Sequence, residues 1–347
     1  MTSTTTYLGM DLGTFKTSVM ASNGKRQAMP TIVGWPKDVV AHTLLGKSVI
    51  FGEEVFRHRL SVDAVRPFEM GALKFLSAAE AEMTETQVDE HRKSAQTFVN
   101  HLVDSVASSD QPIYAVIGAP SHASQENKSV ILDAVADACQ SAMIIPEPFA
   151  VAYGMNCLNE TVVIDIGAGT TDICLMSGSL PTEGQQTTLP LGGDVIDEHF
   201  RRSLLAEYPQ SDVTWNMARL IKERYGFVNS SEDRAVMTLA IDGAERSVDV
   251  TSLLKDSCSV IVEPIIKALV ELLTTFDAEF RDALRGNILL AGGGSQLRGL
   301  DRLLEAELAK LGGGHVRRVP DSLYAGAAGA LRLALQIPQD KWRSMAA

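Results

Sequence analysis

One stretch of the chain combines acids, glycines and threonines at the end of an apolar run. Residues 163–175, VIDIGAGTTDICL, place Asp165 before Gly167, Gly169 and a pair of threonines. Glycines at a tight turn let backbone N–H groups approach an anion, and threonine hydroxyls add further donors. A carboxylate beside a phosphate needs a divalent cation between them, and Mg²⁺, which keeps several of its waters, suits such oxygen ligands. The stretch is therefore a candidate loop for a magnesium-bound polyphosphate.

A second stretch near the N-terminus repeats this pattern. Residues 7–20, YLGMDLGTFKTSVM, place Asp11, Gly13 and Thr17 at the positions that Asp165, Gly167 and Thr171 occupy in the later copy. Each copy has an apolar strand on either side, which predicts two β-hairpins with glycine tips, one in each half of the chain. One D-x-G turn is usually only a turn. Two matched copies, followed by the glycine loop AGGGS at 291–295, favour two hairpins that hold one Mg-nucleotide from opposite sides.

Strands and helices must alternate around these loops. The apolar run 113–117 is followed by a helical pattern over 126–142 and a short apolar run at 143–145, the order of a parallel βαβ unit. Near the C-terminus, residues 287–294 predict a strand that leads into glycines, and residues 295–311 predict a helix. Its apolar face would carry Leu297, Leu300, Leu303, Leu304, Leu308 and Leu311. The predicted fold class is α/β.

Length and composition bound the domain organisation and the class of partner. A chain of 347 residues with 45% apolar content suggests about two domains. The segments from Pro30 to about Ala95 and from about Val195 to Val250 have mixed, charge-rich patterns and are predicted to be insertions. The net charge of −12, without a lysine- or arginine-rich stripe, argues against nucleic-acid binding.

Cysteine usage and hydropathy predict a soluble, cytoplasmic protein. The four cysteines lie far apart, without CxxC or metal-ligand spacing, and are interpreted as reduced core residues: Cys139, Cys157, Cys174 and Cys258. The N-terminal residues MTSTTTY resemble no leader segment, and no apolar run is long enough to cross a bilayer. We also find no amphipathic terminal helix, and therefore expect no direct membrane insertion.

Five motifs together carry a family resemblance. DLGTFKT, DIGAGTTD and LLAGGGSQLRGL resemble the two phosphate loops and the adenosine loop of the superfamily of ATPases that includes actin, Hsp70 and the sugar kinases. PEPFAVAYG at 146–154 and YAGAAGALRLAL at 324–335 resemble its two connecting segments. The resemblance implies an actin-like fold of two duplicated RNase H-like α/β domains with a nucleotide cleft between them.

The resemblance also implies domain boundaries. Domain I would comprise residues 1–150 and the C-terminal residues 325–347, with a small subdomain at about 30–95. Domain II would comprise residues 151–324, with a small subdomain at about 195–250.

Within the superfamily, GGGSQLRGLDRLL resembles the MreB group of bacterial actins. VGWPKDVV, LLGK, FGEEVF and DKWR are similar to the magnetosome-associated actins. This implies an ATPase that polymerises head to tail into cytoskeletal filaments and positions magnetosomes in a chain, with membrane-bound adaptor proteins as partners. An MreB-like cell-shape actin, a ParM-like segregation actin and, further off, a small-molecule kinase or a chaperone-type ATPase remain alternatives.

The resemblance assigns roles to single residues. Asp11 and Asp165 would hold Mg²⁺ largely through water, and Glu147 and Asp165 would orient the water that attacks ATP. Without the resemblance, Glu147 between two prolines is an exposed turn acid, and the charged helix at 219–225 is a solvated face. The residues expected to contact nucleotide are Gly13, Thr14, Phe15, Lys16, Gly167, Gly169, Thr170, Thr171, Gly192, Gly193, Asp194, Lys222, Glu223, Gly292, Gly293, Gly294, Ser295 and Gln296. Lys16 can equally be interpreted as an exposed structural lysine that does not contact the phosphates.

Overall fold

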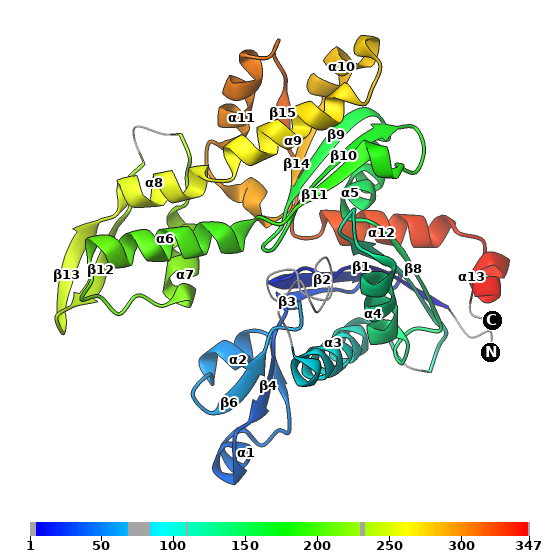
Figure 1. The fold of residues 1–347 in the computed structure, drawn as a ribbon. Helices are drawn as coiled ribbons and strands as arrows, with labels where there is room; N and C mark the ends of the chain where they lie inside the picture. The colour runs from blue at the N-terminus through cyan, green and yellow to red at the C-terminus, as the bar shows by residue number, and fades with distance from the viewer. Residues whose placement is uncertain (1–4, 69–83, 109, 230–232, 346–347) are drawn as a thin grey trace.

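A computed structural model describes residues 5–68, 84–108, 110–229 and 233–345. Within these residues the chain forms two five-stranded mixed sheets of the same topology (Figure 1). The first has the order β3-β2-β1-β7-β8: β1 Thr6–Asp11, β2 Lys16–Ala21, β3 Arg26–Pro30, β7 Ile113–Ala119 and β8 Ser141–Pro146. The second has the order β11-β10-β9-β14-β15: β9 Asn159–Ile166, β10 Thr171–Ser177, β11 Gln186–Leu189, β14 Ile288–Ala291 and β15 Val316–Arg318.

The pairing within the two sheets is also equivalent. β1 and β9 each pair antiparallel with the next strand of the chain and parallel with a later one, β7 or β14. In the two hairpins Asp11 faces Ser18, and Asp165 faces Asp172. This register confirms the predicted internal duplication, with one β-hairpin in each half of the chain.

The central strands of both sheets are buried on both faces. Along β7, Ala115 and Ile117 pack in one core under α3 and α4, whereas Tyr114 and Val116 face a central core. Along β9, Val163 faces the same central core. Because successive strand residues point to opposite faces, the two sheets share one apolar layer between them.

Two helices fill this central layer: α5 (Glu147–Met155) and α12 (Ala325–Gln336) lie between the sheets (Figure 1). They correspond to the two predicted connecting segments. Their backbones approach closely at Gly154 and Gly329, where a Cβ on Gly329 would clash with the carbonyl of Ala150. Small residues in both helices therefore allow the two halves of the molecule to meet at this crossing.

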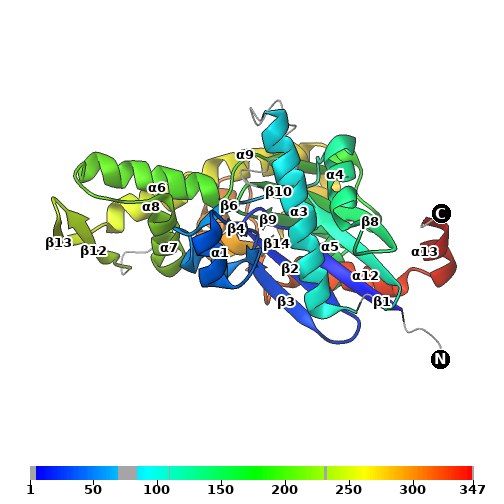
Figure 2. The same cartoon turned by 90° about the horizontal axis from the view of Figure 1, so that it is seen from below.

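Outer helices cover the sheets. On the first sheet, α3 (Glu85–Val106) and α4 (Gln125–Val135) pack on the face away from α12, and α3 runs across that sheet when seen from below (Figure 2). The first turn of α3 is fixed by a capping box in which the Thr84 side chain accepts from the N–H of Gln87. The remaining helices outside the small lobes are α9 Val262–Thr274, α10 Ala278–Arg285, α11 Leu300–Ala309 and α13 Gln339–Met345.

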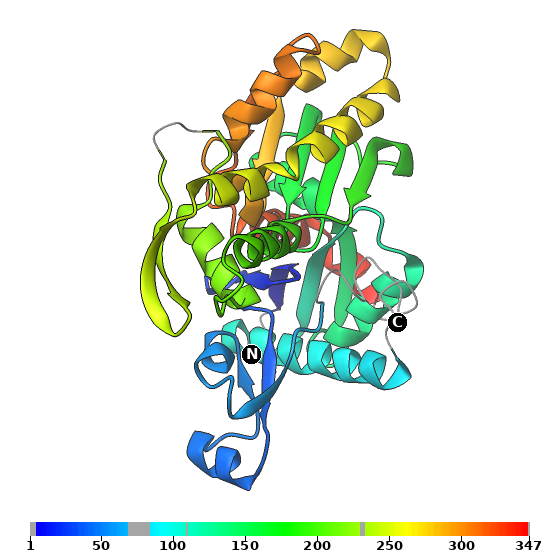
Figure 3. The same ribbon diagram turned by 60° about the vertical axis from the view of Figure 1, so that its left-hand side comes forward.

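Each half also carries a small lobe, formed within the segments where insertions are predicted (Figure 3). The first lobe contains the sheet β5-β4-β6 and two helices: β4 Val33–Pro36, α1 Val39–Leu45, β5 Ile50–Phe51, α2 Glu53–Arg57 and β6 Val62–Val65. The second contains α6 Gly193–Glu207, α7 Trp215–Tyr225, the hairpin of β12 Val236–Ile241 and β13 Ala244–Asp249, and α8 Thr251–Ser259. Residues 69–83 and 230–232 of the predicted insertions lie outside the described residues.

Two helix boundaries differ from the sequence prediction. The helix expected at 295–311 begins at Leu300, because Gly299 before it has a φ of 80° and residues 293–296 form a separate 3₁₀ turn. Leu297 is buried without belonging to the helix, and Leu311 is exposed beyond its end. The helix expected at 126–142 ends at Val135, and a turn then leads into β8.

The expected character of the cysteines is confirmed in large part. All four are free thiols; three are buried, and Cys157 is half-buried beside Arg317. No helix of the described chain is long and apolar enough to cross a membrane.

Candidate nucleotide-binding site

The loop between β1 and β2 is held in a fixed shape. The hydroxyl of Thr31 donates to the carbonyl of Gly13 at 2.8 Å and lies 2.8 Å from the hydroxyl of Thr17. A Cβ on Gly13 would clash with the carbonyl of Lys16, so the turn requires glycine at this position. The Lys16 side chain is exposed. The loop is therefore a rigid, glycine-dependent turn.

The loop between β9 and β10 is supported by the segment that follows β11. The N–H of Gly193 donates to the carbonyl of Gly167 at 3.0 Å, and the N–H of Asp194 donates to Ala168 at 2.8 Å. The Thr171 hydroxyl donates to the carbonyl of Leu191 at 2.8 Å. The structure thus places residues 192–194, which are predicted to contact nucleotide, against the second loop.

Asp165 and Asp11 each lie against a glycine. A Cβ on Gly292 would clash with the Asp165 carboxylate, and Gly292 has a φ of 73°, which favours glycine on both counts. A Cβ on Gly326 would lie 2.8 Å from an Asp11 oxygen. Gly326 belongs to the first turn of α12, and a helix N-terminus favours a nearby carboxylate.

Glu147 lies near Asp11 on the first sheet. Asp11 faces Gly118 across the parallel pair β1 and β7, and a Cβ on Gly118 would lie 3.1 Å from Cγ of Glu147. Glu147 is the first residue of α5 and is half-buried. The predicted metal residue and the predicted catalytic residue therefore flank the same glycine.

A buried acid joins the two sheets beside these residues. One oxygen of Asp172 accepts from the N–H of Ser121 at 2.7 Å and from the hydroxyl of Thr188 at 2.6 Å. Asp172 lies opposite Asp165, while Ser121 follows β7, the strand that pairs with Asp11. This contact connects the end of the second hairpin that carries Asp165 to the end of the first sheet that carries Asp11. Asp172 is not among the site residues predicted from sequence, although an acid within an apolar strand is a signal that could have identified it.

Helix α7 contacts the first loop and the start of α6, which supports the second loop. The ring of Trp215 lies 6.3 Å from that of Phe15, and the Arg219 guanidinium lies 4.4 Å from the Phe15 ring centre. At the other end, the Lys222 ammonium donates to the carbonyl of Gly193 at 2.8 Å and pairs with Asp197 at 2.8 Å. The sequence analysis missed Asp197. Burial raises the pKa of its carboxyl to about 6, against the opposing effect of Lys222.

The glycine loop after β14 packs against the end of β9. The Ser295 hydroxyl donates to the carbonyl of Gly292 at 2.7 Å, and Gln296 donates to the hydroxyl of Ser322 at 2.9 Å. A Cβ on Gly294 would clash with the side chain of Ile166. The predicted adenosine residues Gly292–Gln296 therefore lie beside the second hairpin. Glu223 differs, since it is exposed and pairs with Arg219 at 2.8 Å.

The donors at the site fit a magnesium-bound nucleotide better than a metal held by protein alone. Among the residues that the structure describes, no group of three or more His, Cys, Asp and Glu side chains could hold a metal ion. Asp11 and Asp165 offer carboxylate oxygens, and Mg²⁺ commonly binds through one or two carboxylates, waters and phosphate oxygens. Both loops also contain glycines, Gly13 and Gly167, whose missing Cβ atoms allow tight turns of the kind that present backbone N–H groups to anions.

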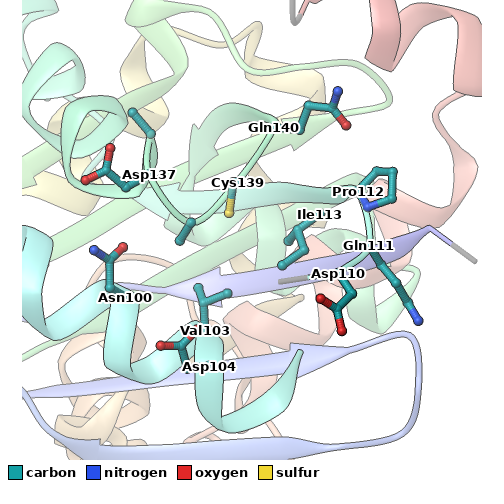
Figure 4. Close-up of a pocket in the computed structure, with 12 residues that line it drawn as sticks. Asn100, Val103, Asp104, Asp110, Gln111, Pro112, Ile113, Asp137, Cys139 and Gln140 are labelled. Atoms are coloured by element: carbon teal, nitrogen blue, oxygen red, sulfur yellow. The ribbon is translucent and has the colours of Figure 1, made fainter. Parts of the chain in front are cut away.

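A cavity of about 620 Å³ lies elsewhere on the first sheet (Figure 4). Its lining includes Asp104, near the end of α3, and Gln111 and Gln140, which directly precede β7 and β8. The hairpin loops lie at the carboxyl ends of β1 and β9. Because α/β sheets bind ligands at the carboxyl ends of their strands, we place the nucleotide site at the loops.

The chain is similar to known proteins over nearly its whole length. Residues 5–339 match the family model described as MreB/Mbl protein. The chain is 35% identical over 340 residues to the actin-like protein MamK of Paramagnetospirillum magneticum, an alignment that covers 98% of this chain and 95% of MamK.

Two solved structures are similar over nearly the whole chain. The MamK double helical filament matches with a TM-score of 0.90 at 34% identity, covering 96% of this chain and 100% of the other. A non-polymerising MamK mutant bound to AMPPNP matches with a TM-score of 0.71 at 35% identity, with the same coverage. These matches confirm the expected fold, an actin-like fold built from two RNase H-like α/β sheets.

Proposed function

Because the chain belongs to the MreB/Mbl family of bacterial actin-like proteins, we propose that it binds Mg-ATP between its two hairpin loops and uses it to assemble filaments. The observation that carries the proposal is the duplicated hairpin, with Asp11 and Asp165 in equivalent positions and with Asp172 bonded across to the first sheet. The similar MamK structure that contains AMPPNP, an ATP analogue, supports the choice of nucleotide.

In this proposal the two loops bind the phosphates through backbone N–H groups and threonine hydroxyls. Residues 13–15 act from the first sheet and residues 167–171 from the second, while residues 192–194 border the γ-phosphate. Lys222 and residues 292–296 lie on the adenosine side. The division into a domain of residues 1–150 with 325–347 and a domain of residues 151–324 belongs to the same proposal, supported by the packing of α12 on β1.

Hydrolysis needs little covalent chemistry from the protein. The γ-phosphoryl group leaves through a loose, in-line transition state, so catalysis consists of positioning water and stabilising charge. A bound Mg²⁺, held by Asp11 and Asp165 through water, would supply positive charge at the phosphates. Glu147 and Asp165 orient the attacking water and accept its proton late. Turnover is slow, because part of this geometry forms only when subunits meet.

Assembly follows from a head-to-tail contact between copies of the chain. A heterologous contact that does not close into a ring generates an open filament. The filament structure of the similar protein MamK supports this mode of assembly. ATP favours the contact in our proposal, and hydrolysis weakens it.

The cellular role rests on the resemblance to MamK alone. We propose a cytoplasmic filament that positions magnetosomes in a chain through membrane-bound adaptor proteins. The cell-shape proteins Mbl and MreB, at 25 to 26% identity, represent the alternative role within the family.

Sedimentation of the purified protein with and without Mg-ATP tests the biochemical proposal. The expected result is a pellet that appears with Mg-ATP, contains filaments by negative-stain microscopy, and releases phosphate slowly. Protein that binds no ATP, or that stays in the supernatant with Mg-ATP at every concentration, would contradict it. Transfer of phosphate to a sugar without filaments would favour the kinase alternative.

A further inference from the structure

Arg66 links parts of the molecule that are distant in sequence. It directly follows β6 of the first small lobe, and its guanidinium lies 3.4 Å from the carboxylate of Asp194 in α6. The side chains of the pair are only 10% and 4% exposed. The same guanidinium lies 5.1 Å from the ring centre of Phe15 and 4.9 Å from that of Trp215. Arg66 is thus enclosed by an acid and two aromatic rings.

These contacts reach both hairpin loops. Phe15 belongs to the first loop, between β1 and β2. Asp194 is bonded through its backbone N–H to Ala168 in the second loop. The Arg66 side chain therefore contacts the first loop directly and is connected to the second loop through Asp194. A change in the position of Arg66 must alter the distance between the two loops, since interiors are too closely packed to absorb it.

The ion pair also changes the charge that a nucleotide meets. Asp194 lies in the first turn of α6, beside the loop that we propose binds phosphate. An uncompensated carboxylate there would repel a triphosphate, because few waters remain to screen buried charges. Arg66 supplies the compensating charge from the other half of the chain.

We propose that Arg66 is a positioning residue that neutralises Asp194 and sets the spacing of the two phosphate loops, and that its loss accelerates the release of ATP. This inference rests on the proposed function, since it assumes a triphosphate between the loops.

Release of a fluorescent ATP tests the inference. Wild type and variants are loaded with Mg and mant-ATP below the concentration needed for assembly, and the dissociation rate is measured after a chase with excess ATP. Arg66→Gln is expected to release mant-ATP about tenfold faster, because Asp194 is left as an unpaired buried charge. Arg66→Lys, which keeps the positive charge beside Asp194, is expected to release mant-ATP at near the wild-type rate. A role of Arg66 in packing alone would not separate the lysine variant from the glutamine variant.

Arg26→Gln is the matched control. Arg26 also pairs with an acid, Asp321 at 3.1 Å, and lies 4.6 Å from the ring centre of Tyr324, but its side chain is exposed. Its loss is expected to leave the release rate unchanged. If Arg66→Gln does not fold, Arg66→Lys alone decides, since a retained positive charge beside Asp194 must not accelerate release.

Two results would overturn the inference. One is release from Arg66→Gln at the wild-type rate; the other is release from Arg66→Lys as fast as from Arg66→Gln. Failure of the wild type to bind mant-ATP at all would instead contradict the proposed function, so the two failures are distinguishable.

Discussion

Asp172 of the second sheet accepts a hydrogen bond of 2.7 Å from the backbone N–H of Ser121, which follows the first sheet. The same oxygen accepts from Thr188 at 2.6 Å, and the carboxylate is 1% exposed. Because Asp172 also faces Asp165 across the second hairpin, this bond fixes where that hairpin lies relative to the first sheet. The geometry of the nucleotide site thus depends on a residue that need not touch the nucleotide.

Replacing this acid should weaken the whole fold. Asp172→Ala is expected to lower the free energy of unfolding by about 2 to 3 kcal/mol, because a buried backbone N–H loses its acceptor. Denaturant unfolding measures the change. Asp249→Ala is the control, since Asp249 accepts from the N–H of Thr251 at 2.9 Å at an exposed site. Equal losses of unfolding free energy in the two variants would show that the bond between the sheets stabilises the fold no more than an exposed hydrogen bond does.

Replacing Gly292 should destabilise the fold and disrupt the nucleotide site. Gly292→Ala is expected to lower the free energy of unfolding by about 2 to 4 kcal/mol, from an unfavourable φ and a clash with Asp165. It should also abolish ATP binding. Gly243→Ala separates the two causes, because Gly243 has a nearly equal φ of 72° with nothing near its Cβ. The free energy of unfolding of Gly243→Ala should fall by about 1 kcal/mol, and this variant should bind ATP normally. A comparable loss of stability in both variants would show that the clash with Asp165 contributes little.

Glu147 should be needed for hydrolysis and not for binding. Glu147→Ala is expected to release phosphate at least about a hundredfold more slowly, the usual size of a lost acid–base contribution. Assembly with ATP should remain and give persistent filaments. Glu126, an exposed acid in the first turn of α4, provides the control variant Glu126→Ala. Phosphate release at the full rate from Glu147→Ala would remove the residue from the catalytic role.

The raised pKa of Asp197 predicts a pH dependence of stability. Burial raises this pKa to about 6, so between about pH 4 and 6 the folded protein keeps a proton that the unfolded chain releases. The free energy of unfolding must therefore fall as pH rises through this window, by an amount of the order of 3 kcal/mol. Asp197→Asn should lack this component. A difference between wild type and Asp197→Asn that stays constant from pH 4 to 7 would contradict the assignment.

The duplicated hairpins could be predicted from sequence because their information is local. Asp11 and Asp165 are each followed by a glycine turn between two apolar strands, and the structure reproduces this in both sheets. The residues that hold the two hairpins in place could not be predicted in this way. Arg66, Asp172 and Asp197 act through partners far away along the chain, and no local pattern identifies such partners.

For the helix near the C-terminus, leucine spacing predicted the buried face but not the first residue. The leucine spacing at 297–311 indicates a helix, and Gly299 inside that spacing was the signal for its later start at Leu300. Periodicity identifies the buried face of an element, whereas the backbone conformation of single residues determines where the element begins.

The most direct test of the account is an experimental structure of the protein with Mg-AMPPNP. We predict density for the triphosphate in contact with both hairpin loops, residues 12–15 and 167–170, and for a magnesium ion between the phosphates and the carboxylates of Asp11 and Asp165. A nucleotide bound elsewhere, or held by one loop with the other distant from it, would contradict the central claim.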